Sequence, residues 1–354
     1  MHHPSQITSN AFQTSARERI EGYVSRARGH AGGVVALTPD ASTREYFRIP
    51  WAKKGSAIAA VYPEPFDPDI HPFLDLTRLF AEAKLPVPEI LDVDPLNGII
   101  VQEDFGDNQL RRSFETATED EREAHTERAI QLIADIQAAT QLAFDRKSIA
   151  SRLSFDEAKL SWELDYFREH FFKSMRREEL PRAEEAELRA ELNDVSAELA
   201  ACARVLCHRD FHSSNLMIDR KVRLRMVDYQ DARIGPASYD LVSLLLDRQT
   251  SLPSLAEIRE RRLFFLEERR KRGLEAIDPD EFAREFRLMT VQRCLKAVGT
   301  FSYQTGVLGR GETYSQFIDP MLRIVLQAAE WLNRFPTLQS VIRERVGGEG
   351  GAES

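Results

Sequence analysis

Short apolar segments separated by polar turns dominate the first hundred residues, and their length is typical of strands. Proline or glycine follows several of them, as expected where a strand ends. The predicted strands are residues 34–37, 46–49, 58–62, 89–92 and 99–102. Helical spacing of apolar residues is found instead at residues 16–28 and 73–83. The pattern predicts a small sheet with one accompanying helix, preceded by an N-terminal helix.

The hydrophobic period changes beyond residue 103 to one that is typical of helices. Apolar residues recur there at three- and four-residue steps, as one buried helix face requires, at Leu188, Leu192, Val195, Leu199 and Cys202. Residues 129–139 and 241–246 predict further helices. Two short strands, residues 216–218 and 222–227, indicate a hairpin inside this helical part.

These patterns predict an α+β protein with two lobes. We expect a β-rich N-lobe at residues 1–103 and a larger, mainly α-helical C-lobe at residues 104–346. The tail of residues 347–354 is rich in Gly and Glu, which predicts disorder.

Composition narrows the class of protein. With 354 residues, 42% of them hydrophobic, the chain can bury a substantial core. A net charge of -9 argues against a nucleic-acid partner, whose binding surface requires basic residues. Three cysteines, an odd number without metal-ligand spacing, favour reduced thiols. Because the chain has neither a long apolar run nor an apolar signal core, we expect a cytoplasmic protein without a membrane anchor.

The segment with the most specific chemistry is residues 207–218, which reads CHRDFHSSNLMI and has the form H-R-D-x4-N. Asp228 follows it in the sequence VDYQD, and the predicted hairpin returns Asp228 to the side of Asn215. Phosphoryl transfer needs a carboxylate that accepts the proton of a hydroxyl group, together with oxygen ligands for magnesium. We expect Asp210 to be the base, with Asn215 and Asp228 as the ligands of Mg²⁺.

Two other interpretations of this segment remain open. Asp, Asn and His are common in turns and caps, so their grouping can arise by chance. Alternatively His208, Asp210 and His212 alternate along an extended segment and therefore face one way, as metal ligands would. That interpretation leaves Asn215 and Asp228 without a role.

The motif resembles the aminoglycoside phosphotransferase and choline kinase superfamily, and most closely the N-acetylmuramate/N-acetylglucosamine anomeric kinases. The matching segments are residues 40–48, 85–90, 208–215, 228–232, 235–246 and 292–299. The resemblance implies a protein-kinase-like fold and ATP-dependent phosphorylation of the anomeric hydroxyl of an amino sugar in peptidoglycan recycling. It also implies that Asp240 braces the catalytic loop, and we expect His208 to support that loop.

The chain departs from the usual kinase pattern at the phosphate-binding loop. Residues 40–44 lack glycine, and the third predicted strand, residues 58–62, lacks the usual lysine. Ser42, Thr43 and Arg44 are therefore our candidate phosphate contacts, because guanidinium N–H groups suit phosphate oxygens. Arg48 is an alternative to Arg44, and either side chain can instead be an ordinary strand-edge charge.

The remaining candidate contacts concern adenine and the acceptor. Adenine is expected at the connector between the lobes, with contacts from Gln102, Glu103 and Phe105. Two clusters of polar residues are candidates for the acceptor, and each can equally be the wet side of a helix: Glu163 with Asp165, and Gln292 with Arg293 and Lys296.

Three functions follow from these residues. The leading one is an ATP- and Mg²⁺-dependent kinase for N-acetylmuramate and N-acetylglucosamine. A second keeps the chemistry but takes another alcohol, such as an aminoglycoside or a choline-like acceptor, for which an acidic pocket is required. A third is a nucleotide-binding pseudokinase, suggested by the missing lysine. The sequence does not indicate an oligomeric state.

Overall fold

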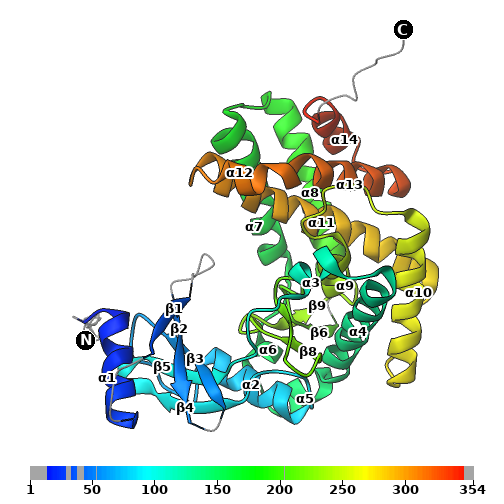
Figure 1. Cartoon of the computed structure of the whole chain (residues 1–354). Coiled ribbons are helices and arrows are strands. Elements are labelled where there is room, and N and C mark those ends of the chain that lie inside the picture. Colours follow the sequence, from blue (N-terminus) through cyan, green and yellow to red (C-terminus); the bar gives the residue numbers. More distant parts are fainter. Residues whose placement is uncertain (1–13, 29–32, 38–43, 53, 203, 347–354) are drawn as a thin grey trace, which may run out of the picture. The chain divides into compact units, whose positions relative to one another are not determined.

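The computed structural model describes residues 14–28, 33–37, 44–52, 54–202 and 204–346 (Figure 1). They divide into two compact units, of which the first comprises Met1–Asn108 and Met217–Val227 and the second comprises Gln109–Leu216 and Asp228–Ser354. The predicted tail, residues 347–354, lies outside the described residues.

A five-stranded antiparallel sheet forms the centre of the first unit, with strand order β1-β2-β3-β5-β4. Its strands are β1 (Val35–Leu37), β2 (Glu45–Trp51), β3 (Gly55–Val61), β4 (Ile90–Asp94) and β5 (Ile99–Glu103). The other elements before Asn108 are α1 (Ala16–Arg28), α2 (Pro72–Glu82) and the 3-10 helix η1 (Pro95–Asn97). These elements confirm the predicted small sheet and its helices.

Helix α1 covers one face of this sheet. Ile20 and Val24 lie in a buried cluster with strand residues such as Phe47, Ala59 and Val101. Phe47 stands opposite Ala59, and Ala59 opposite Val101, so the three side chains share one face of the pleated sheet. The apolar face that this alternation gives to the sheet therefore packs against the N-terminal helix α1.

The hairpin predicted inside the helical part belongs structurally to the first unit. Strands β7 (Leu216–Ile218) and β8 (Leu224–Met226) form a two-stranded sheet. Ile218 N donates to Asn108 O, and Met226 N donates to Pro86 O. These backbone hydrogen bonds tie the hairpin to segments distant in sequence, which the local pattern of apolar residues could not reveal. The first unit also extends past residue 103, to Asn108.

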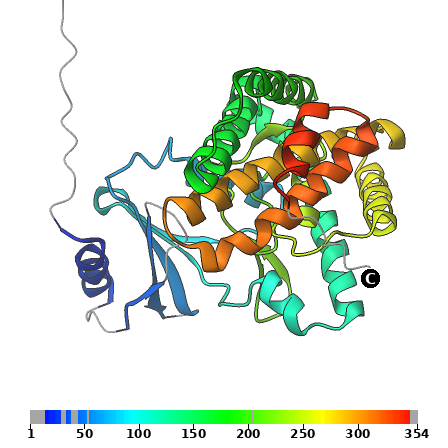
Figure 2. The same cartoon turned by 90° about the horizontal axis from the view of Figure 1, so that it is seen from above.

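The second unit is mainly helical, as predicted. Its long helices are α4 (Glu119–Ala138), α7 (Glu157–Arg168), α8 (Arg182–Ala201), α10 (Leu255–Lys271), α11 (Pro279–Gly306) and α13 (Ile318–Leu332). The shorter ones are α3 (Leu110–Thr116), α5 (Thr140–Asp145), α6 (Ile149–Arg152), α9 (Tyr239–Leu246), α12 (Gly311–Tyr314) and α14 (Pro336–Arg343), with η2 (Glu169–Arg176) and η3 (Ser315–Phe317). Figure 2 shows the helices of this unit from above, with α11 beside α13.

Helix α11 is the buried centre of the second unit and packs closely on α7. A Cβ atom at Gly299 would lie 2.7 Å from Phe167 Cα and 2.9 Å from Phe167 N. Only glycine fits so near a neighbouring backbone. The two helices therefore approach closely at this point, which fixes how their polar residues face each other.

A short antiparallel pair, β6 (Val205–Cys207) and β9 (Arg233–Gly235), brackets the segment with the catalytic motif. Gly235 is required here because a Cβ atom would lie 2.7 Å from the ring of Phe155 and 2.9 Å from Cys207 Sγ. The pairing brings the two ends of residues 208–232 together in space.

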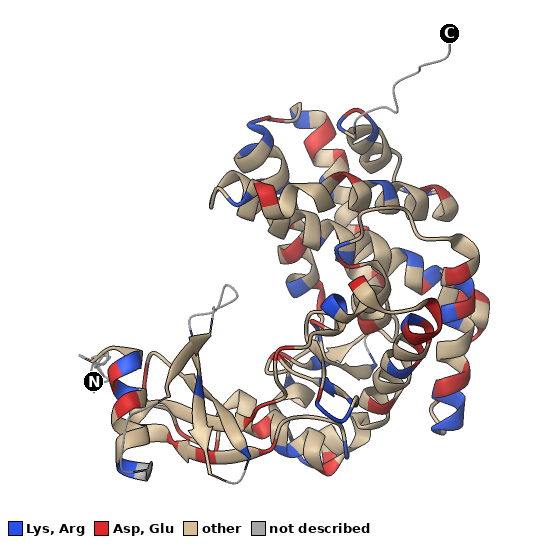
Figure 3. Ribbon diagram, in the orientation of Figure 1, with Lys and Arg blue, Asp and Glu red and all other residues tan. Residues whose placement is uncertain are grey.

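Charged residues of both signs are interspersed on the outer helices of the second unit, for example on α4 and α10 (Figure 3). Within the described ranges, none of the helices has the length and apolar character needed to cross a membrane.

Candidate active site

Asp240, at the start of α9, anchors the backbone that leads into the catalytic motif. His208 N donates to its Oδ2 at 2.7 Å, and Arg209 N donates to its Oδ1 at 3.0 Å. Burial raises the pKa of Asp240 to about 7, although these two N–H groups favour the ionised form. Arg209 has a φ of 87°, which is uncommon for a residue with a side chain. The two hydrogen bonds hold this turn, from which Asp210 projects.

Three cations surround the carboxylate of Asp210. Lys296 Nζ and Arg293 Nη2 each lie 3.5 Å from Oδ1, and Arg209 Nη1 lies 3.6 Å from Oδ2. Burial alone would raise the pKa of Asp210, but Lys296, Arg209 and Arg293 outweigh it and hold that pKa well below its usual range. The carboxylate is therefore ionised, and 22% of its side chain is exposed. It can accept a hydrogen bond from a hydroxyl group that approaches it.

The Asn215 side chain lies beside that of Asp228 and is hydrogen-bonded to the main chain of Asp210. Asn215 Nδ2 donates to Asp210 O at 3.0 Å and to Asp228 Oδ2 at 3.4 Å. The amide nitrogen is thus used within the loop, which leaves the amide oxygen as an available ligand. Asp228 has a φ of 65°, a conformation that costs about 1–3 kcal/mol in a residue of this kind and is typical of functional positions. Gln230 Nε2 also donates to Asp228 Oδ1, at 2.8 Å.

The other polar residues of the motif have structural partners. Arg209 Nη1 donates to Asp231 Oδ2 at 2.7 Å, so the Asp231 carboxylate pairs with a cation. The side chain of His208 is fully buried. His212 is affected by burial as well, which lowers its pKa. Among the described residues, there is no group of three or more His, Cys, Asp or Glu side chains placed to hold a metal. The alternative in which His208, Asp210 and His212 bind a metal together is therefore wrong for these residues.

The two predicted acceptor clusters meet across α7 and α11. Gln292 Nε2 donates to Glu163 Oε2 at 2.9 Å, and both side chains are buried. Arg293 is also buried, and besides its pair with Asp210 its Nη2 donates to Ser243 Oγ at 2.9 Å. Little of the surface of Glu163, Gln292 and Arg293 is exposed. Their contact with the acceptor therefore stays a prediction.

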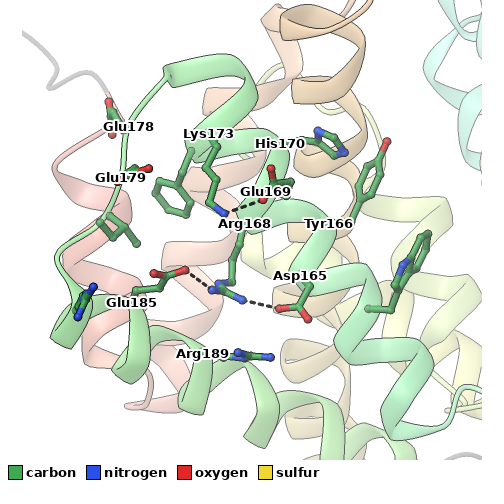
Figure 4. Close-up of a pocket in the computed structure, with 14 residues that line it drawn as sticks. Asp165, Tyr166, Arg168, Glu169, His170, Lys173, Glu178, Glu179, Glu185 and Arg189 are labelled. Carbon is green, nitrogen blue, oxygen red and sulfur yellow. Dashed lines mark hydrogen bonds and ion pairs between the residues drawn. The ribbon is translucent and has the colours of Figure 1, made fainter.

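Asp165 faces a different part of the second unit. It lines a cavity of about 570 Å³ between the end of α7, η2 and the start of α8 (Figure 4). Arg168 spans this cavity wall, at 2.5 Å from Asp165 Oδ1 and 2.6 Å from Glu185 Oε1. Asp210 is not among the described residues that line it. The predicted role of Asp165 in acceptor binding stays a prediction.

In the first unit, Arg48 and Lys54 have carboxylate partners. Arg48 Nε lies 2.7 Å from Asp104 Oδ2, and its Nη2 lies 2.8 Å from Asp107 Oδ1. Lys54 Nζ lies 2.5 Å from Glu89 Oε2. The guanidinium of Arg44 lies 5.8 Å from the ring centroids of Tyr46 and Tyr62. Arg44 is thus placed against aromatic rings, while Ser42 and Thr43 lie outside the described residues.

The predicted adenine contacts lie at the end of β5 and just after it. Gln102 pairs in register with Ile58 of β3, and Phe105 is buried. Arg225 of the hairpin lies 4.1 Å from the centroid of the Phe105 ring and 3.1 Å from Glu103 Oε2. Their contact with adenine stays a prediction.

Sequence reasoning named Lys296 only as a candidate for the acceptor and gave Arg209 no role, yet both side chains lie beside Asp210. The signal for Lys296 was present, since it follows Arg293 by three residues on one helix and must share its face. The pairing of Arg209 with Asp231 had no signal of its own, because it depends on the turn at residues 228–232.

The model of a protein family, the phosphotransferase enzyme family, matches residues 33–274 of the chain. This match defines the class of protein. The chain belongs to this family and is an enzyme. Solved structures agree on the fold: a choline/ethanolamine kinase family protein from Mesorhizobium loti has a TM-score of 0.53 at 18% identity, covering 93% of this chain and 100% of its own. The streptomycin–ATP–APH(2")-IIa ternary complex has a TM-score of 0.52 at 15% identity, covering 84% of this chain and 97% of its own. The fold is therefore protein-kinase-like.

One relative gives a more specific comparison than the family model and the solved structures do. The N-acetylmuramate/N-acetylglucosamine kinase of Neisseria meningitidis serogroup B is 29% identical over 314 residues, which cover 88% of this chain and 90% of that protein.

Proposed function

We propose that this phosphotransferase transfers the terminal phosphoryl group of ATP to the anomeric hydroxyl of N-acetylmuramate and N-acetylglucosamine. The observation that carries the proposal is that Asn215 links Asp210 and Asp228 through its hydrogen bonds, with the Asp210 carboxylate ionised and partly exposed. Membership in the phosphotransferase family supports the same reaction class, and the name of the Neisseria meningitidis relative supports the same substrates.

In this reaction Asp210 accepts a hydrogen bond from the acceptor hydroxyl and aligns its oxygen with the terminal phosphorus of ATP. The oxygen forms the new P–O bond, and the bond from that phosphorus to the bridging oxygen breaks, so ADP leaves with the electron pair. The hydroxyl proton passes to an Asp210 carboxylate oxygen. Lys296 and Arg293 keep Asp210 ionised until that point.

Asn215 and Asp228 fit a magnesium site. Both present hard oxygen donors, and Asn215 directs its amide nitrogen to Asp210 O, which leaves its oxygen for a cation. When bound, Mg²⁺ neutralises charge on the ATP phosphates. The positive φ of Asp228 and its hydrogen bond from Gln230 orient the carboxylate before any cation binds.

On the side of ATP, the proposal keeps Ser42, Thr43 and Arg44 as phosphate contacts and Gln102, Glu103 and Phe105 as adenine contacts. Arg44 directly follows Ser42 and Thr43 in the sequence, and its guanidinium suits phosphate oxygens, which supports it as the cation of this set. Because ATP is used in the cytoplasm, the proposal places the enzyme there.

The cations around Asp210 argue against a cationic acceptor. A choline-like or aminoglycoside acceptor would meet Lys296 and Arg293 beside the base, and like charges at such distances repel. An amino sugar that is neutral or carries a carboxylate meets no such repulsion. The intact set of Asp210, Asn215 and Asp228 likewise supports an enzyme over a pseudokinase.

A substrate panel tests the proposal directly. The purified protein is assayed for ADP release with Mg²⁺ and ATP on N-acetylmuramate, N-acetylglucosamine, choline and an aminoglycoside. We expect turnover on the two amino sugars, with the phosphate on the anomeric oxygen as located by NMR. Turnover only on choline or the aminoglycoside would overturn the acceptor assignment, and no turnover on any of the four would contradict the amino-sugar kinase.

A further inference from the structure

Lys159, on the first turn of α7, is a cation of the second unit that the reaction described above does not use. Its Nζ lies 3.6 Å from Glu163 Oε1 and 4.2 Å from the centroid of the Trp162 ring. The Glu163 side chain is only 1% exposed, whereas that of Lys159 is 24% exposed. The ammonium therefore contacts both a buried carboxylate and the face of an aromatic ring, and part of the Lys159 side chain remains accessible.

A short series of contacts connects Lys159 to the catalytic aspartate. Glu163, which holds Lys159, accepts a hydrogen bond from Gln292. The next residue on α11, Arg293, pairs with Asp210. Lys159 is also close enough to Arg209 for that guanidinium to influence its titration. Lys159 thus lies at the margin of the same polar cluster as the base.

Lys159 shares this cluster with other cations. Arg209, Arg293 and Lys296 pair with Asp210 or Asp231, and Lys159 pairs with Glu163. Burial lowers the pKa of Lys159, and Arg209 and Arg233 lower it further although Glu163 opposes them. A partly buried cation in such surroundings is stabilised by an anion that binds next to it.

Arg293 and Lys296 pair with the base itself, whereas Lys159 pairs with Glu163. Arg293 is 5% exposed, pairs with Asp210, donates to Ser243 and lies 5.7 Å from the centroid of the Tyr239 ring. Lys296 pairs with Asp210. Lys159 is consequently the cation best placed to meet a ligand without disturbing the base.

We propose that Lys159, held against Trp162, binds the carboxylate of an acidic amino-sugar acceptor and so favours that acceptor over its uncharged counterpart. The inference rests on the proposed function. The indole of Trp162, 57% exposed, provides an apolar face beside the ammonium for the C–H groups of the sugar or its acidic substituent.

The phosphates of ATP are the other anions that the reaction brings to the enzyme. The test therefore distinguishes binding of the acceptor carboxylate by Lys159 from binding of the ATP phosphates. Michaelis constants are measured for ATP, N-acetylmuramate, N-acetylmuramate methyl ester and N-acetylglucosamine. The enzymes are the unaltered protein, Lys159→Met and Lys159→Arg. The ester removes the negative charge from the ligand while the variant removes the positive charge from the protein, so the pair forms a double-mutant cycle.

On the unaltered enzyme, we expect esterification to raise the Michaelis constant by about 10- to 100-fold, as for loss of a charged hydrogen bond. Lys159→Met should raise the Michaelis constant for N-acetylmuramate to the same degree. Its Michaelis constants for the ester, N-acetylglucosamine and ATP should stay within about twofold of those of the unaltered enzyme. Lys159→Arg should recover most of the loss, because it restores the charge.

Lys271→Met is the matched control, since Lys271 also pairs with a glutamate on its own helix but lies on α10. It should change none of the four constants. Thermal melting shows whether each variant is folded, and if Lys159→Met is not, the ester comparison on the unaltered enzyme still decides. Equal constants for acid and ester overturn the inference, as does a Lys159→Met effect confined to ATP. Turnover of N-acetylglucosamine shows in the same assay that the proposed function stands even where the inference fails.

Discussion

Asp210 is held as an anion by three neighbouring cations, which makes it a weak proton acceptor in the resting enzyme. Such a carboxylate still orients a hydroxyl group strongly, because it accepts a charge-assisted hydrogen bond. In a loose phosphoryl-transfer transition state the hydroxyl becomes acidic only as its oxygen bonds to phosphorus. The environment of Asp210 therefore suits late proton transfer, with orientation as its main contribution before that step.

Replacing Asp210 with asparagine tests this role. Asp210→Asn keeps the shape but removes the negative charge, so we expect turnover to fall by about 10²- to 10⁴-fold. ATP affinity, measured by calorimetry, should be retained. Because the charge on Lys296 and Arg293 is then uncompensated, melting curves must confirm that the variant is folded. Turnover close to that of the unaltered enzyme would remove Asp210 from the mechanism.

The proposed function gives Asp228 a separate role, as a ligand of Mg²⁺ together with Asn215. Asp228→Ala should lower turnover more than Asp210→Asn does, because ATP then lacks its link to Mg²⁺. Calorimetric titration with ATP, with and without Mg²⁺, checks the reason. The unaltered enzyme should bind ATP more tightly with Mg²⁺, and the variant should lose that difference. A variant that keeps both the difference and full turnover would contradict the proposed ligand.

At the scale of elements, the close approach of α7 and α11 sets the geometry of the polar cluster. Gly299→Ala would place a Cβ atom 2.7 Å from Phe167 Cα, so we expect a loss of about 1–3 kcal/mol in the free energy of unfolding. Helix propensity alone predicts the opposite, a gain of up to about 1 kcal/mol. Denaturant titration measures the difference.

Gly22→Ala in α1 is the control for that variant. The nearest heavy atom to its new Cβ is Arg26 Nη1, at 3.5 Å, so this substitution meets ordinary contact only. It should be neutral or stabilising. If Gly299→Ala and Gly22→Ala have the same effect, the tight packing of α11 on α7 is not a stability determinant.

The start of α9 predicts a pH dependence of stability. Asp240 has a pKa raised to about 7 in the folded protein, above the value of about 3.9 in an unfolded chain. The folded state therefore binds more protons between these values, and the free energy of unfolding contributed by Asp240 falls as pH rises from about 4 to about 7. Asp240→Asn should show a smaller fall than the unaltered enzyme between pH 5 and pH 7.5 in urea titrations. Identical pH slopes in the two proteins would mean that Asp240 does not titrate in this range.

At the scale of the whole molecule, ATP needs a cation that the third strand does not provide. Strand β3 contains no lysine, and Arg44 directly follows Ser42 and Thr43 in the sequence. Arg44→Ala should therefore raise the Michaelis constant for ATP by about tenfold or more, with the melting temperature unchanged, as for loss of a charged hydrogen bond. Arg26→Ala, on the exposed side of α1, serves as the control and should leave the constant as it is. A nucleotide-bound structure with Lys54 on the phosphates would show that Arg44 is the wrong residue.

The sequence by itself determined the elements and the chemistry. Apolar residues at steps of two or of three and four depend only on local geometry, so the sheet of the first unit and helices such as α8 could be predicted from them. The spacing of Asp210 and Asn215 lies within one turn, and its meaning does not depend on distant segments. Family resemblance added the substrate.

Only the tertiary structure decided which distant residues meet. The hairpin of β7 and β8 joined the first unit through hydrogen bonds to Asn108 and Pro86, which no local pattern encodes. Lys296 and Arg293 of α11 meet Asp210, which lies more than 80 residues earlier in the chain, and Gly299 lets α11 pack against α7. The same packing buried Glu163 and left Lys159 partly exposed. Charge compensation and burial depend on contacts across the chain, and those exist only once it has folded.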